Sequence, residues 1–113
     1  MRLFILAAVV AAVRTGTTIA EELRIGTASL GGAFDPMGQL ISNLVNKHAG
    51  NDISMVSVVT GGSAQNPRLT DSGEVEISIT NNNLAKLAVA GAGSYSSVPI
   101  DIKAVAALQP QRV

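Results

Sequence analysis

Short apolar segments, separated by turns of glycine and small polar residues, divide most of the chain into predicted strands. Residues 23–27 and 75–79 alternate between two kinds of side chain with the two-residue period of a β-strand. Residues 53–59 and 102–108 are rich in branched apolar side chains, which favour a buried strand. The pattern therefore predicts strands over these four segments.

Apolar residues spaced three and four positions apart predict a long helix after the first strand. Its stripe consists of Met37, Leu40, Ile41, Leu44 and Val45. The preceding Asp35-Pro36 pair supplies an N-cap and a proline at the first helical position, and Gly50 is suited to the C-terminal end.

Two shorter helices are predicted before the third and fourth strands. In the first of these, either Ser63 is the cap, or Asn66 is the cap and Pro67 occupies the first helical position; both registers remain open. In the second, an asparagine within residues 81–83 caps a helix that carries Leu84, Leu87 and Ala88.

The regular alternation of strand and helix predicts crossover connections. The expected fold is α/β, with a mostly parallel open sheet. In such a sheet the strand-to-helix turns gather at the carboxyl ends of the strands. We therefore expect residues 30–35, 60–66 and 80–83 to face one crevice.

The first twenty residues fit a cleaved secretory signal peptide. Arg2 precedes an apolar run over residues 3–13, and small residues end at Ala20. A membrane anchor or a buried helix is the alternative, but the run is shorter than the roughly 20 residues that a bilayer requires. The interpretation assigns residues 1–20 to the signal peptide and residues 21–113 to a periplasmic product.

Composition and missing motifs narrow the chemistry. Charged residues make up 14% of the chain and balance to zero, which argues against nucleic acid as a partner. One histidine and no cysteine give no support to a metal site, and no cofactor is expected. Gly32 and Ala33 stand where a P-loop requires lysine and a hydroxyl residue, and Gln65 replaces the last glycine of a nucleophile elbow. Enzymatic activity is therefore not predicted.

Recognition of an anion is the chemistry that these turns could supply. Backbone N–H groups at helix starts, with serine and threonine hydroxyls and asparagine amides, could hold a carboxylate, and Phe34 could cover its apolar part. The same residue types also serve as ordinary helix caps. The spacing alone leaves both interpretations open.

Three ordered blocks carry a family resemblance: LRIGT with GGAFDPMG (residues 23–27 and 31–38), VTGGSAQN (59–66) and SGEVEI (72–77). Together they resemble the TAXI family, the extracytoplasmic solute-binding receptors of tripartite ATP-independent periplasmic (TRAP) transporters. The resemblance implies the first lobe of a type II periplasmic-binding-protein fold. It also implies that residues 21–113 form only the N-terminal part of that lobe.

The resemblance further implies what is bound, and where. The family holds small organic acids, such as amino acids or dicarboxylates, between two lobes and delivers them to membrane permease subunits. By position, the ligand contacts in this chain would be Gly32, Ala33, Phe34, Thr60, Gly62, Ser63, Asn66, Asn81 and Asn82. The alternatives are a small phosphate-binding α/β enzyme or regulatory domain, and a truncated fragment without function.

Overall fold

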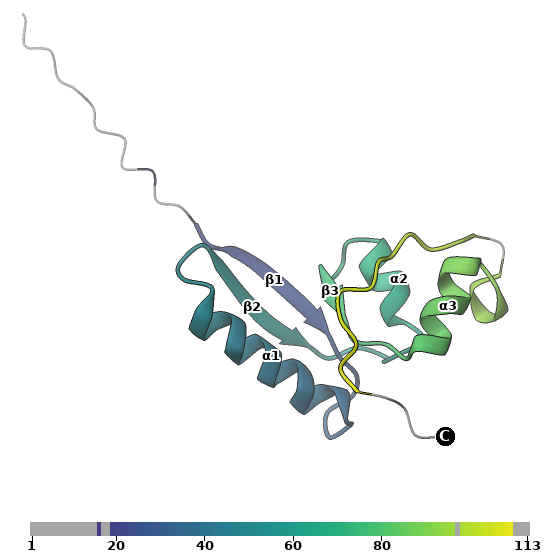
Figure 1. The fold of residues 1–113 in the computed structure, drawn as a ribbon, viewed down its shortest axis with the longest axis horizontal. Coiled ribbons are helices and arrows are strands. Elements are labelled where there is room, and N and C mark those ends of the chain that lie inside the picture. The colour runs from purple at the N-terminus through teal and green to yellow at the C-terminus, as the bar shows by residue number, and fades with distance from the viewer. Residues whose placement is uncertain (1–15, 17–18, 97, 110–113) are drawn as a thin grey trace, which may run out of the picture.

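The computed structural model describes residue 16 and residues 19–96 and 98–109. In chain order the elements are β1 (Glu21–Gly26), α1 (Phe34–His48), β2 (Ile53–Val58), α2 (Asn66–Asp71), β3 (Ile77–Ser78), α3 (Asn82–Ala90) and the 3-10 helix η1 (Gly93–Tyr95). The strands form one parallel sheet in the order β2-β1-β3. The predicted α/β fold with an open parallel sheet is therefore confirmed (Figure 1).

Helix α1 covers one face of the sheet and encloses the main core (Figure 1). The buried centre of this core is Ile25, Met55 and Ile79, and the half-buried residues packed against it are Leu23, Phe34, Met37, Ile41, Val45 and Ile77. The predicted stripe on α1 was only partly right, because Leu40 is 59% exposed and Leu44 is 50% exposed. The packed face instead includes the small residues Gly38 and Ser42, which are buried against the sheet side of the helix.

The start of α1 also differs from the prediction. The helix begins at Phe34 after Ala33, so Asp35 is not the N-cap and Pro36 is not the first helical residue. Asp35 lies instead in the first turn, where the helix dipole favours a negative charge. Its Oδ2 accepts a hydrogen bond of 3.1 Å from Nε2 of Gln39, one turn further along.

Helix α2 adopts neither of the two predicted registers in full. It begins at Asn66 after Gln65, with Pro67 in the first turn, where a missing backbone donor costs nothing. The turn before it already begins at Gly62, whose carbonyl accepts hydrogen bonds from the N–H groups of Gln65 (3.0 Å) and Asn66 (2.9 Å). The prediction of a very short helix with Pro67 near its start is confirmed, but the cap is Gln65.

The sheet is smaller and more exposed than predicted. Strand β3 pairs with β1 over Ile77–Ser78 only. Strand β2 lies at one edge of the sheet rather than in its interior, so Val56 is 39% exposed. Branched apolar residues indicated a strand correctly here, but they did not reveal that one neighbour was missing.

The predicted fourth strand over residues 102–108 is wrong for this structure. The segment is irregular, and no backbone hydrogen bond joins it to any other described residue. Val105 is 80% exposed and Leu108 is 50% exposed. A strand needs a partner for its backbone groups as well as suitable side chains, and this segment has the side chains alone.

A second small core joins α3 to the residues that follow it. Its buried residues are Ala88, Tyr95 and Ile100, with Leu84 and Ile102 packed against them. Within the described part of the chain, no helix has the length and apolar character needed to cross a bilayer. The predicted signal peptide, residues 1–20, falls mostly outside the described residues.

Candidate functional site

The turns that follow the three strands are tied together by side-chain hydrogen bonds. Thr60, after β2, places its Oγ1 atom 3.1 Å from the carbonyl oxygen of Thr27, which follows β1. Thr80, after β3, donates a hydrogen bond of 2.8 Å from Oγ1 to the carbonyl of Ser63. The predicted convergence of these turns at the carboxyl ends of the strands is thus observed for the turns after β2 and β3 and the end of β1.

Asn66 is the central anchor of this arrangement. Its side chain is fully buried, and Nδ2 lies 2.7 Å from the Thr27 carbonyl and 2.6 Å from the Ile79 carbonyl. Its Oδ1 accepts a hydrogen bond of 2.6 Å from the Thr60 hydroxyl. Both polar atoms of the amide are therefore used inside the protein, and the side chain holds the ends of β1 and β3 against the turn after β2.

The turn over residues 61–65 leaves donors available at the surface. Gly62 has φ +88°, a conformation that favours glycine, and a Cβ added there would lie 3.5 Å from Ala28. Oε1 of Gln65 folds back to accept a hydrogen bond of 2.6 Å from the N–H of Gly61. Within the described residues, the N–H groups of Ser63 and Ala64 and the Ser63 hydroxyl donate to no protein acceptor. These groups can bind an acceptor from solution.

Helix α3 adds a second group of donors beside this turn. Asn81 precedes the helix in an extended conformation, φ −77° and ψ 140°, as an N-cap residue does. The N–H groups of the first helical turn, beginning with exposed Asn82, have no acceptor within their own helix. The prediction that an asparagine in residues 81–83 caps this helix is confirmed in position.

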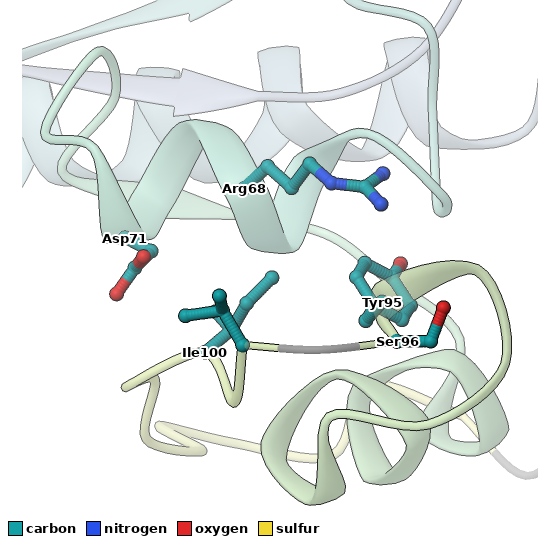
Figure 2. Close-up of a pocket in the computed structure, with 6 residues that line it drawn as sticks. Arg68, Asp71, Tyr95, Ser96 and Ile100 are labelled. Carbon is teal, nitrogen blue, oxygen red and sulfur yellow. The ribbon is translucent and has the colours of Figure 1, made fainter.

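A separate small cavity of about 310 Å³ lies between α2 and the segment after α3 (Figure 2). Figure 2 shows Arg68 and Asp71 projecting from α2 towards Tyr95 and Ile100. The Arg68 guanidinium lies 4.7 Å from the centre of the Tyr95 ring and donates a hydrogen bond to the Ser94 carbonyl. Asp71 accepts a hydrogen bond of 3.1 Å from the N–H of Asp101. These contacts fasten the segment to α2, so the charged groups already have partners.

One ion pair stabilises the other end of the sheet. Arg24 on β1 donates a 2.7 Å hydrogen bond from Nη2 to Oε1 of Glu76, and its backbone N–H donates another of 2.7 Å to Oε2. These hydrogen bonds from Arg24 lower the pKa of Glu76 to about 2. The hydrogen bond to Glu76 in turn raises the pKa of Arg24. The two side chains are 42% and 35% exposed, so the ion pair lies at the surface.

A comparison with protein families shows which family this chain belongs to. The sequence profile of the NMT1-like family matches residues 25–113, which is most of the chain. The chain belongs to the NMT1-like family. No curated protein is similar enough to count as a match.

NMT1-like proteins are related to periplasmic binding proteins, and the family is generally non-enzymatic. Membership supports a solute-binding role with a small-molecule ligand, and it is compatible with the receptors of TRAP transporters without being specific to TAXI. The open parallel sheet of the described residues is consistent with part of a periplasmic-binding-protein lobe.

Four of the residues proposed as ligand contacts make contacts within this NMT1-like chain. The side-chain polar atoms of Asn66 and Thr60 form hydrogen bonds with each other and with the Thr27 carbonyl. Phe34 is partly buried and packs against the core around Ile25. The N–H of Gly32 donates a 3.1 Å hydrogen bond to the Ser29 carbonyl within its own turn.

The remaining predicted contacts stay available at the surface or beside it. They are Ala33 before α1, Ser63 in the turn after β2 and Asn82 at the start of α3. Gly62 is buried, its N–H donates a 3.1 Å hydrogen bond to the Thr60 hydroxyl, and Asn81 precedes α3 as its N-cap residue. Sequence reasoning missed the contact between Thr80 and Ser63 as well as the close approach of Gly38 to Thr27. The signal for the contact between Thr80 and Ser63 was a threonine directly after the predicted strand over residues 75–79. No local sequence pattern indicated the close approach of Gly38 to Thr27.

Proposed function

We propose that this chain is the ligand-binding part of the first lobe of an extracytoplasmic solute receptor of the TAXI type. It binds a small carboxylate, such as an amino acid or a dicarboxylate, and serves a TRAP permease. The observation that carries the proposal is the turn over Gly62, Ser63 and Ala64, whose unused donors lie beside the start of α3. Membership of the NMT1-like family supports the solute-binding part of this proposal.

A carboxylate suits this turn for electrostatic reasons. The N–H groups of Ser63 and Ala64 and the Ser63 hydroxyl are hydrogen-bond donors that lack protein acceptors in the described chain. The Thr80 hydroxyl fixes the Ser63 carbonyl, so the donors are held in place before a ligand arrives. The buried carboxylate of Asp35 accepts a hydrogen bond from Gln39 on α1, so it does not occupy the donors of this turn.

Burial of the ligand requires more protein than this half-site offers. Pockets for small molecules bury most of the ligand surface, whereas Ser63 is half-buried and Asn82 is exposed. In the mechanism that we propose, a second lobe closes over the bound carboxylate, and the closed form is the one that the permease recognises. The signal-peptide interpretation of residues 1–20 supplies the route to the periplasm.

The proposal is tested by calorimetric titration of the chain with a panel of amino acids and dicarboxylates. Removal of a hydrogen bond to a charged group costs about 1.5 to 3 kcal/mol, so Ser63→Ala should weaken binding about tenfold or more. Ser72→Ala is the matched control, because Ser72 follows the last residue of α2, at the opposite end of that helix from this turn, and its hydroxyl bonds to Leu69 and Glu74. Equal losses in the two variants, or a response to inorganic phosphate alone, would contradict the proposal.

A further inference from the structure

Three consecutive backbone carbonyls in the turn after β2 all accept hydrogen bonds from within the protein. The Gly62 carbonyl accepts two from N–H groups at the start of α2, of 2.9 and 3.0 Å. The Ser63 carbonyl accepts one of 2.8 Å from the Thr80 hydroxyl, and the Ala64 carbonyl accepts one of 2.7 Å from the Tyr95 hydroxyl. Among the described residues, the backbone groups of these three residues that keep no partner are the N–H groups of Ser63 and Ala64.

The planar peptide bond lets these contacts set the direction of the two free donors. In a trans peptide, the C=O of one residue and the N–H of the next lie in one plane and point in opposite directions. The hydrogen bonds to the Gly62 carbonyl therefore orient the Ser63 N–H, and the Thr80 hydroxyl orients the Ala64 N–H. The Tyr95 hydroxyl holds the next peptide, so both peptides that flank the Cα of Ala64 are fixed.

Tyr95 is held in place independently of any ligand. Its side chain is 3% exposed and belongs to the small core with Ala88 and Ile100. The Arg68 guanidinium lies 4.7 Å from the centre of its ring, and Figure 2 shows the Arg68 side chain extending from α2 on the same side as this ring. A ring packed in this way places its hydroxyl at a fixed position, here at the Ala64 carbonyl.

We infer that Tyr95 and Thr80 are positioning residues for carboxylate binding at this turn. Their hydroxyls engage the carbonyls of Ala64 and Ser63, so the two residues offer hydrogen-bond donors and no free backbone acceptor to solution. Such a surface selects for an acceptor such as a carboxylate. The inference rests on the proposed function, because it concerns the same turn and the same class of ligand.

Tyr95→Phe isolates the hydroxyl, because phenylalanine keeps the ring and its packing. The Ala64 carbonyl then loses its partner, the turn samples other orientations, and the fraction of molecules ready to bind falls. We expect lower order parameters for the N–H groups of Ser63 and Ala64, and an affinity for carboxylates that is about three- to tenfold weaker. Thr80→Val, which keeps the β-branched shape, should act in the same way, whereas Thr80→Ser keeps a hydroxyl and should bind as the parent does.

Nuclear magnetic resonance on the full chain, labelled with ¹⁵N, measures both effects. Relaxation gives the order parameters without ligand, and titration with amino acids and dicarboxylates, L-glutamate and succinate among them, gives the affinity from the Ser63 and Ala64 signals at constant ionic strength. Ser42→Ala is the matched control, because it removes a hydroxyl that donates a 2.8 Å hydrogen bond to the Gly38 carbonyl within α1. This variant should lose stability as Tyr95→Phe does, with the order parameters of the turn and the affinity unchanged.

The outcomes separate this inference from the proposed function. Order parameters or an affinity that stay at the parent values in Tyr95→Phe would overturn the inference alone, since the parent would still bind a carboxylate. Equal changes in Ser42→Ala would also overturn it, because lost stability would then explain the result. A folded parent whose Ser63 and Ala64 signals respond to no member of the panel would contradict the proposed function, and the binding role of Tyr95 with it.

Discussion

Replacement of Asn66 by alanine tests whether the buried amide holds the three turns together. The parent side chain makes hydrogen bonds of 2.7 Å to the Thr27 carbonyl, 2.6 Å to the Ile79 carbonyl and 2.6 Å to the Thr60 hydroxyl. Alanine leaves these groups without their partner in a fully buried position. An unsatisfied buried polar group costs about 1 to 3 kcal/mol, and water entering the new space offsets part of that cost.

We therefore expect Asn66→Ala to lower the free energy of unfolding by about 3 to 6 kcal/mol, allowing for partial relaxation. A domain of this size has a total stability of roughly 5 to 15 kcal/mol, so most of the variant would unfold well below the parent midpoint. Urea denaturation followed by far-UV circular dichroism measures the difference. Asn83→Ala is the matched control, because Asn83 is exposed and its side chain forms no hydrogen bond with another described residue.

The refuting result is a variant with parent stability. If Asn66→Ala unfolds within about 0.5 kcal/mol of the parent, as an exposed position would, the amide is not an anchor. Weaker ligand binding at unchanged stability would instead return Asn66 to the set of ligand contacts.

Three further predictions concern the helix and the ion pair. A Cβ added at Gly38 would lie 2.2 Å from Cγ2 of buried Thr27, so Gly38→Ala should lower the thermal midpoint, since overpacking by about 1 to 3 kcal/mol outweighs the roughly 1 kcal/mol gained in helix propensity; an unchanged or higher midpoint would contradict the close packing. Leu40→Gln should alter stability by less than about 0.5 kcal/mol in urea, because Leu40 is exposed, and a larger loss would restore it to the core. The folded-state pKa of Glu76 is about 2, below its ordinary value of 4.5, so the Arg24 pair contributes stability fully above pH 4.5 and loses it as the pH falls towards 2. Acid titration of Glu76→Gln should lack that part of the decline, and identical acid profiles would refute it.

The sequence predicted those parts of the fold that depend on local pattern. Strand β1, the glycine-rich turns and the helical segments follow from periodicity and from the positions of Gly, Asn and Pro. The ends of the sheet did not follow, because residues 102–108 have the composition of a strand but no partner to pair with. Leu40 and Leu44 likewise fitted a helical stripe, but the face that packs is decided by where Gly38 allows α1 to approach Thr27.

The site was predicted less completely than the fold. Residue type and turn position brought Ser63 and Gly62 to the carboxyl ends of the strands, as a parallel sheet requires. The same reasoning could not separate Asn66 from them, since an asparagine that binds a ligand and one that binds backbone carbonyls look alike in sequence. Burial alone distinguishes them, and burial depends on β1, β3 and the turn after β2 meeting around one side chain.

The most direct test of solute binding is a calorimetric titration of the chain and its Ser63→Ala variant with a panel of amino acids and dicarboxylates. Because this half-site leaves part of the ligand exposed, the account predicts weak binding of at least one carboxylate to the parent. Binding should weaken about tenfold or more in the Ser63→Ala variant, while the Ser72→Ala control binds as the parent does. A folded parent that binds none of the panel, or a ligand whose affinity is the same in parent and Ser63→Ala, would contradict it.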